Sequence, residues 1–171
     1  MRLFFAIWPK DDIRLALAAQ RLEVARLTGG RPILPVTLHL TMVFAGNVPQ
    51  TRLLEMKMVA SRLRAAPFRY TVNTAGCFAT PRIAWLASDQ PPQALFELQQ
   101  ALHDGVHAAD FDVDSRTFRP HITVARHITA AIETHPISPC HWDVDEFSLV
   151  QTVQDGNGVQ YEVIDRWPLI R

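Results

Sequence analysis

Cysteine and lysine are scarce in this chain of 171 residues, and neither sign of charge is in excess. The two cysteines, Cys77 and Cys140, lie far apart and form neither a disulfide framework nor a Cys-x-x-Cys motif. We therefore expect two buried free thiols. Seventeen basic residues balance seventeen acidic ones, which excludes the strong overall field that holds a long polyanion. Any contact with nucleic acid should be small and local.

Long apolar runs are also missing. No run approaches the ~18 residues that cross a bilayer, and the apolar start ends at Pro9 and Lys10, too early for the core of a signal peptide. We expect a cytoplasmic protein without membrane contact. With 48% hydrophobic residues, the chain can form one domain over residues 1–171 around a substantial core. Fifteen of its basic residues are arginines, whose planar guanidinium suits bidentate phosphate binding.

Periodicity and turn residues predict a mixed order of strands and helices. We expect strands over residues 3–8, 37–44, 68–74, 83–87 and 118–126, helices over 13–27, 51–63 and 94–107, and a closing hairpin from 142–150 and 159–164. Asp11 or Asp12 is expected to cap the first helix, and Gly29-Gly30 to end it. The turn of the hairpin is expected at residues 155–158.

One pattern occurs twice along the chain: an apolar strand, a helix, a loop with proline, and a strand that carries His-x-Thr. Phe5 precedes His39 by 34 positions, and Trp85 precedes His121 by 36. A repeated unit of this size suggests two similar half-domains that face each other.

The two His-x-Thr strands carry the chemistry that we expect. Because side chains alternate along a strand, His39 and Thr41 share one face, and His121 and Thr123 do the same. Two such strands facing each other make a symmetric polar cleft. In-line displacement at phosphorus needs one group to take a proton and a second, on the opposite side, to give one. Two imidazoles with pKa values near ~6.5 can do both without a metal.

The residues around both motifs carry a family resemblance. Segments 39–46 and 118–126 resemble the paired signatures of the 2H (two-histidine) phosphoesterases, and most of all those of the RNA 2′,3′-cyclic phosphodiesterases, also called 2′-5′ RNA ligases. Segments 2–7, 76–86 and 158–161 resemble the same family in order and spacing. The chain departs from the pattern at Ala87, where glycine is usual, and at Gln151, where serine is common.

The resemblance implies a bilobal, pseudo-symmetric α+β fold with two antiparallel β-sheets lining a central groove and helices outside. It implies opening of an RNA 2′,3′-cyclic phosphate to a 2′-phosphomonoester, with no cofactor and no metal ligand. The implied roles are His39 as general acid, His121 as general base, Thr41 and Thr123 on the phosphoryl oxygens, Arg126 near phosphate and base, and Phe44 stacking on the terminal nucleobase. Arg119 is a weaker candidate.

Several alternatives stay open. The residues alone do not assign acid and base, and the substrate could be a small cyclic nucleotide instead of RNA. The reverse reaction could form 2′-5′ linkages, or the chain could bind RNA ends without turnover. His103 and His107 have the spacing of a metal-binding pair, but Gly105 between them and the missing carboxylate argue against one. The expected partners are RNA 3′ ends, tRNA fragments among them, and the expected state is a monomer.

Overall fold

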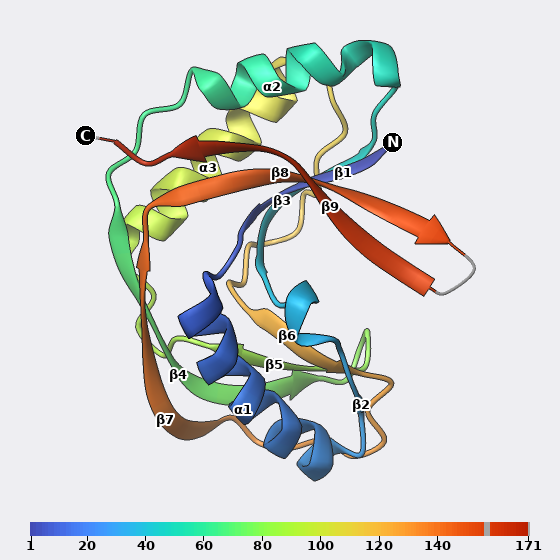
Figure 1. The fold of residues 1–171 in the computed structure, drawn as a ribbon, viewed down its shortest axis with the longest axis vertical. Coiled ribbons are helices and arrows are strands. Elements are labelled where there is room, and N and C mark those ends of the chain that lie inside the picture. Colours follow the sequence, from blue (N-terminus) through green and yellow to red (C-terminus); the bar gives the residue numbers. More distant parts are fainter. Residues whose placement is uncertain (156–157, 171) are drawn as a thin grey trace.

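The computed structural model describes residues 1–155 and 158–170, so the centre of the predicted hairpin turn, Gly156-Asn157, lies outside the described residues. Figure 1 shows the elements in place. In chain order they are β1 (Arg2–Ile7), α1 (Asp11–Thr28), β2 (Arg31–Pro32), the 3-10 helix η1 (Pro35–Thr37), β3 (Leu40–Asn47), η2 (Gln50–Arg52), α2 (Leu53–Ser61), β4 (Phe68–Phe78), β5 (Ile83–Ala87), α3 (Gln93–Ala108), β6 (Ile122–Arg126), β7 (His135–Val144), β8 (Glu146–Asp155) and β9 (Gly158–Pro168).

All strand pairings in the sheet are antiparallel, and the strand order is β7-β4-β5-β6-β3-β1-β8-β9, with β2 paired to β6. One residue pair, Leu40 with Ile122, joins β3 to β6. The α+β class predicted from the sequence is confirmed, but the expected two sheets are hydrogen-bonded into one nine-stranded sheet. Its two halves, β7-β4-β5-β6 with β2 and β3-β1-β8-β9, meet at that single pair.

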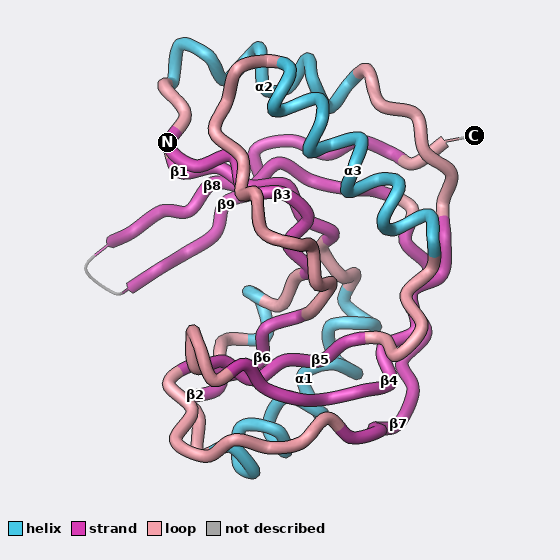
Figure 2. The backbone as a smooth tube through the Cα atoms, turned by 180° about the vertical axis from the view of Figure 1, so that it is seen from behind, coloured by secondary structure: helices cyan, strands magenta, loops and turns pink. Residues whose placement is uncertain are grey.

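Each long helix packs on the half of the sheet opposite to the strand that precedes it. Helix α1 follows β1 but packs against β5, β6 and β7, whereas α3 follows β5 but packs against β3 and α2. Figures 1 and 2 show α1 beside the lower half and α2 with α3 beside the upper half. The two strand-helix-strand units, β1-α1-β3 and β5-α3-β6, therefore have matching connections, and each pairs its own two strands directly.

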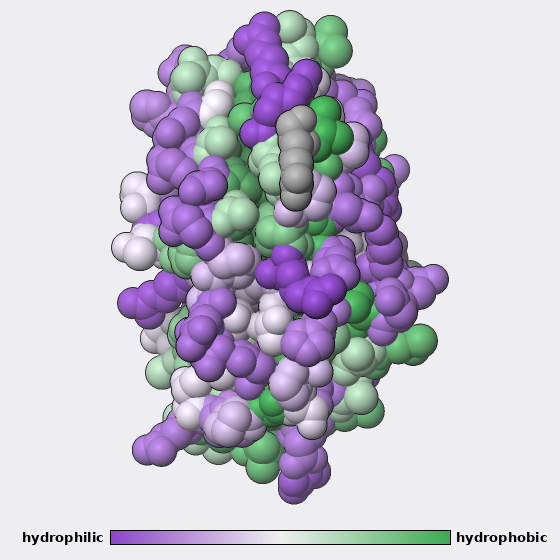
Figure 3. Space-filling model, turned by 90° about the vertical axis from the view of Figure 1, so that its left-hand side faces the viewer, coloured by the Kyte–Doolittle hydropathy of each residue, from purple (hydrophilic) through white to green (hydrophobic). Residues whose placement is uncertain are grey.

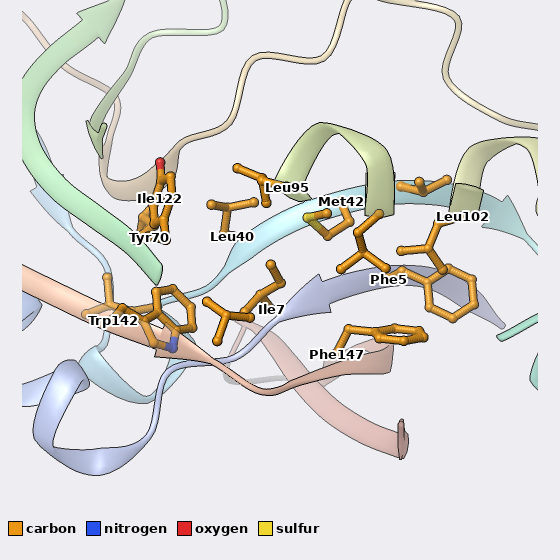
Figure 4. Close-up of a cluster of buried hydrophobic side chains, with 14 of the residues drawn as sticks. Phe5, Ile7, Leu40, Met42, Tyr70, Leu95, Leu102, Ile122, Trp142 and Phe147 are labelled. Carbon is orange, nitrogen blue, oxygen red and sulfur yellow. The ribbon is translucent and has the colours of Figure 1, made fainter. Parts of the chain in front are cut away.

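The main core lies between the helices and one face of the sheet. Four residues of α3, spaced as one helical stripe, are buried in it: Leu95, Leu98, Leu102 and Val106. Figure 4 shows Leu95 beside Leu40 and Met42, and Leu102 beside Phe5. Leu40 and Ile122 are both 0% exposed, so the pair that joins the halves is sealed on its helix side.

The prediction that Asp11 or Asp12 caps α1 is wrong, because the helix already begins at Asp11. Lys10 is the N-cap, and Asp11 and Asp12 lie in the first turn, where carboxylates favour the positive end of the helix dipole. Gly29 ends the helix in the left-handed conformation, as the sequence predicts. Within α1, Leu17 is buried, whereas Leu22 is 56% exposed.

The surface mixes hydrophilic and hydrophobic side chains, as Figure 3 shows for one face. Exposed arginines pair locally with carboxylates, for example Arg69 with Asp143 at 2.7 Å and Arg26 with Glu23 at 2.7 Å. This agrees with a chain of zero formal net charge. Among the helices of the described residues, none is long and apolar enough to span a membrane.

Candidate active site

Both histidines of the His-x-Thr motifs lie immediately before a strand. Strand β3 begins at Leu40 and β6 at Ile122, so the prediction that the histidines lie inside strands 37–44 and 118–126 is wrong. The chain before His39 is the 3-10 helix η1, and Pro120, which lacks an N–H for pairing, precedes His121. Each imidazole therefore lies directly before the first residue of a central strand.

The two imidazoles make the same hydrogen bond. Nδ1 of His39 is 2.7 Å from the carbonyl oxygen of Thr37, and Nδ1 of His121 is 2.7 Å from the carbonyl oxygen of Arg119. A carbonyl oxygen only accepts, so Nδ1 must carry the proton in both rings. In the neutral ring the free lone pair is then on Nε2, and proton exchange with a substrate takes place there.

The pair that joins the two halves also sets the arrangement of the motifs. Because Leu40 and Ile122 pair antiparallel, the flanking positions lie across from each other, which puts His39 toward Thr123 and His121 toward Thr41. Leu40 and Ile122 point into the main core, so the flanking residues point to the opposite, helix-free face. Each histidine is thus placed beside the threonine of the other motif.

A β-bulge in β3 turns Phe44 onto the same face as Thr41. Thr41 is opposite Ala6 and Phe44 is opposite Phe4, while Met42 has no partner on β1. Strict alternation would place Phe44 on the face opposite to Thr41, and one extra residue reverses this. Phe44 is 41% exposed, and its ring centroid is 5.8 Å from that of Phe4.

A second bulge, at the equivalent position of β6, does the same for Arg126. Thr123 is opposite Trp85 and Arg126 is opposite Ile83, while Val124 has no partner on β5. Arg126 is therefore brought to the face of Thr123, although it lies three residues further along the strand. In both strands, the two residues between the threonine and the exposed side chain are buried.

Aromatic rings surround His39. Trp8 stacks on it with ring centroids 4.9 Å apart and an interplanar angle of 3°. Tyr161 meets it edge-on at 5.1 Å, and Phe4 lies tilted at 5.1 Å. Burial lowers the pKa of His39 from its usual value to about 4, despite the opposing effect of the hydrogen bond to Thr37. The ring is thus neutral at pH 7 in the unliganded chain.

His121 has a smaller aromatic shell. Phe78 meets it edge-on at 5.2 Å and in turn contacts Trp85 at 5.5 Å. Burial again lowers the pKa, the hydrogen bond to the Arg119 carbonyl opposes this, and the nearby charge of Arg126 lowers it further. The charges of Arg126 and His121 also lower the pKa of His39. These three side chains therefore lie within electrostatic range of one another.

Three polar groups of this face are free to bind a ligand. Within residues 1–155 and 158–170, the Arg126 guanidinium and the Thr41 and Thr123 hydroxyls have no hydrogen-bond or ion-pair partner. Arg31, which the sequence did not single out, is paired across from Arg126 on β2. The face thus presents two imidazoles, two hydroxyls and cationic side chains to one anionic ligand.

The other polar residues singled out in the sequence do not join this cluster. His103 and His107 stack on each other along α3, with ring centroids 6.3 Å apart, and Nδ1 of His103 is 3.3 Å from Asp104. In the part of the chain that the structure describes, no group of three or more His, Cys, Asp or Glu side chains is arranged to hold a metal ion. Trp8, Tyr161 and Phe78 were not predicted as site residues.

Solved structures with this fold include phosphoesterases. A crystal structure described as a phosphoesterase has a TM-score of 0.89 at 30% identity, covering 99% of this chain and 98% of its own. Escherichia coli LigT gives the same values in its apo form and in complex with 3′-AMP. The class is therefore that of the phosphoesterases.

A comparison with protein families assigns the chain to one family within this class. The model of the 2′-5′ RNA ligase superfamily matches residues 9–156, and the chain belongs to that superfamily. An RNA 2′,3′-cyclic phosphodiesterase of Escherichia coli is 32% identical over 170 residues, which are 98% of this chain and 96% of the relative. One from Thermus thermophilus is 31% identical over 181 residues, covering 99% and 90%.

Proposed function

We propose that the protein hydrolyses RNA 2′,3′-cyclic phosphate ends to 2′-phosphomonoesters. The observation that carries the proposal is the crossed arrangement at the Leu40–Ile122 pair, which places His39 toward Thr123 and His121 toward Thr41. The relatives that bear the name RNA 2′,3′-cyclic phosphodiesterase support the same substrate. Three expectations stay predictions: residues 1–171 form one domain of two similar lobes, the protein is a monomer, and it is cytoplasmic.

The reaction uses Nε2 of both imidazoles. Neutral His121 takes a proton from water as the water oxygen attacks phosphorus, and protonated His39 gives a proton to the 3′ oxygen as its bond to phosphorus breaks. The product is the 2′-phosphomonoester. Because each Nδ1–H is held by a backbone carbonyl, each ring has a fixed tautomer and orientation for this transfer.

The remaining groups bind the phosphoryl oxygens. As negative charge builds on the two non-bridging oxygens, the hydroxyls of Thr41 and Thr123 donate hydrogen bonds to them, and the unpaired Arg126 stabilises that charge. The phosphate of the substrate also raises the pKa of both histidines, since a nearby anion favours the imidazolium. Substrate binding therefore supplies the protonation that burial disfavours in the free chain.

The terminal nucleobase is expected on the His39 side. The 3′ leaving oxygen and the base belong to the same nucleoside, so both lie on the side of the general acid. Phe44, exposed and in contact with Phe4, supplies a stacking surface on this half of the sheet.

The decisive experiment incubates the protein in EDTA with a short RNA that ends in a 2′,3′-cyclic phosphate and identifies the product monoester. We expect a 2′-phosphate. A 3′-phosphate would contradict the assignment of the leaving oxygen, and loss of activity in EDTA would contradict metal-independent catalysis.

Two variants separate catalysis from binding. His39→Asn and His121→Asn are each expected to lower the rate at least ~100-fold, because each removes one proton transfer. Both should still bind the RNA end, because the threonines and Arg126 remain. Full binding with no turnover in the unmodified protein would instead indicate an RNA-end-binding module.

A further inference from the structure

Two arginines lie next to each other on the site face of the lower half of the sheet. Arg31 of β2 is paired directly across from Arg126 of β6, so both side chains lie on the face of Thr123. Figure 1 shows β2 beside β6. Like charges directly across a strand pair destabilise a sheet. An anion bound at the two guanidinium groups would remove this repulsion, so the pair is suited to a negatively charged ligand.

The backbone around β2 fixes the position of Arg31. At Gly30 the chain passes so close to β6 that an added Cβ would lie 2.9 Å from the Ile128 side chain. A side chain there would clash, and glycine allows the approach. Beyond β2, the N–H of Ile33 donates a hydrogen bond of 3.0 Å to the carbonyl oxygen of Val124. Arg31 is therefore held beside β6 by contacts on both sides of it in the sequence.

The Arg31 side chain is available to a ligand. Exposed arginines elsewhere on the surface pair with carboxylates, as Arg69 does with Asp143 and Arg166 with Glu146, each at 2.7 Å. Arg31 is also exposed, but its guanidinium has no hydrogen-bond or ion-pair partner within residues 1–155 and 158–170. Its charge is therefore not neutralised by the described part of the chain.

Arg31 lies farther from the reacting phosphate than Arg126 does. The charge of Arg126 lowers the pKa of both His39 and His121, whereas Arg31 contributes to neither shift. The reacting phosphate lies between the two histidines in the proposed mechanism, where Arg126 reaches it. The anion that Arg31 binds is therefore a second group of the substrate.

The shape of a nucleoside indicates which group this is. The base leaves the ribose at C1′, and the 5′ carbon leaves it at C4′, on the other side of the ring oxygen. With the base on Phe44 in the upper half of the sheet, the 5′ carbon points away from Phe44 and toward the lower half. In an RNA chain the 5′ oxygen carries the next phosphate, and that phosphate is the nearest further anion of the substrate.

We infer that Arg31 binds the phosphodiester on the 5′ side of the terminal nucleotide of the RNA. The inference rests on the proposed function and narrows its substrate class to RNA ends, because a free cyclic mononucleotide lacks this phosphodiester. The planar guanidinium can donate two parallel hydrogen bonds to the non-bridging oxygens of one phosphate. Such a contact positions the chain but reads no sequence, so the base before the terminal nucleotide is not selected.

The test uses three substrates that differ at this phosphate. They are adenosine 2′,3′-cyclic phosphate, a diadenosine dinucleotide that ends in a 2′,3′-cyclic phosphate, and the same dinucleotide with an uncharged methylphosphonate as its internal linkage. For the wild type we expect kcat/KM about tenfold higher for the charged dinucleotide than for the uncharged one, the effect of one charge-assisted hydrogen bond. The gain should appear in KM and leave kcat unchanged, because this phosphate takes no part in the reaction.

Substitution of Arg31 should remove this preference. We expect Arg31→Gln to lower kcat/KM for the charged dinucleotide about tenfold, and to change the other two substrates by less than about twofold. Arg31→Lys keeps the charge without the planar fork and should retain part of the preference. Arg62→Gln is the matched control. Arg62 is an exposed arginine at the end of α2, on the helix side of the sheet, and its substitution should change none of the three rates.

Each other outcome overturns a stated part of this scheme. A wild type that hydrolyses the charged and the uncharged dinucleotide equally well has no site for the second phosphate, and this result needs no variant. If Arg31→Gln slows all three substrates equally, Arg31 acts on the reacting phosphate or on the fold, and the inference is wrong. If Arg119→Gln removes the preference and Arg31→Gln does not, the phosphate lies at Arg119 instead.

The same substrates separate this inference from the proposed function. Hydrolysis of all three without any preference refutes the site at Arg31 and leaves the proposed function intact. A wild type that hydrolyses none of them refutes the proposed function, and the inference with it.

Discussion

Acidification should destabilise this fold through His39. Burial against Trp8, Tyr161 and Phe4 lowers its pKa from 6.5 to about 4. Between these two values the unfolded chain binds a proton that the folded chain does not, so stability rises with pH in this range. The contribution of His39 is fully present above pH 6.5 and is lost as the pH falls toward 4. At ~1.4 kcal/mol per pH unit it amounts to about 3 kcal/mol.

The assay is urea unfolding of the wild type and of His39→Asn over a series of pH values between 7 and 4. The asparagine amide can replace Nδ1 as donor to the Thr37 carbonyl, but it does not titrate. All other groups titrate in both proteins, so the difference between the two curves isolates His39. We expect the wild type to lose about 3 kcal/mol more than the variant by pH 4. Parallel curves would refute the burial of a neutral imidazole at this site.

Three further predictions concern the pH profile, Arg126 and Gly76. The pKa values of His39 and His121 are both lowered in the free chain, so the bell-shaped plot of kcat/KM against pH should have both its acid and its alkaline limb below pH ~6.5. A limb above pH ~7 would contradict this. Arg126→Gln should lower kcat/KM for the cyclic phosphate about 10- to 100-fold, and Arg126→Lys should recover part of it; equal losses would indicate a need for the guanidinium fork rather than for charge alone. Gly76→Ala should cost about 1–3 kcal/mol in urea unfolding, since the added Cβ would lie 2.5 Å from the Trp85 ring; an unchanged midpoint would refute this contact.

The sequence predicted most strands and helices. The prediction failed for a strand that contains proline, because the place of a strand in the sheet decides whether proline is tolerated. Strand β7 contains Pro136 and Pro139, and no strand was expected between residues 126 and 142. In the structure β7 pairs only with β4, at the edge of the sheet. An edge strand tolerates proline, because its unpaired side needs no N–H donor. Edge position depends on the order of all the strands, which local periodicity does not contain.

The candidate site was likewise predicted only in part from the sequence. Alternation along a strand correctly groups each histidine with its threonine, but it would place Phe44 and Arg126 on the other face. The unpaired residues Met42 and Val124 reverse that assignment. A bulge arises from pairing with a neighbouring strand, so no signal within either segment could have revealed it. Only the resemblance to the two-histidine family pointed to these two side chains.

Surroundings, rather than the motifs, must decide which histidine is the acid, because both Nδ1 atoms make the same 2.7 Å hydrogen bond. Trp8 presents its ring face to His39, whereas Phe78 meets His121 at an interplanar angle of 86°. A ring face attracts a cation, and the parallel stacking on His39 shows that Trp8 presents its face there. Once the phosphate of the substrate raises both pKa values, the ring face of Trp8 therefore helps to stabilise an imidazolium at His39.

Trp8→Leu tests this reasoning, because it keeps an apolar side chain but removes the ring face. In the substrate complex we expect the alkaline limb of kcat to move to lower pH by roughly 0.4 to 1.5 units, the effect of losing a cation–π contact of ~0.5–2 kcal/mol. Phe78→Leu is the matched control, and it should move the limb less. A limb that moves more in Phe78→Leu than in Trp8→Leu would assign the acid to His121.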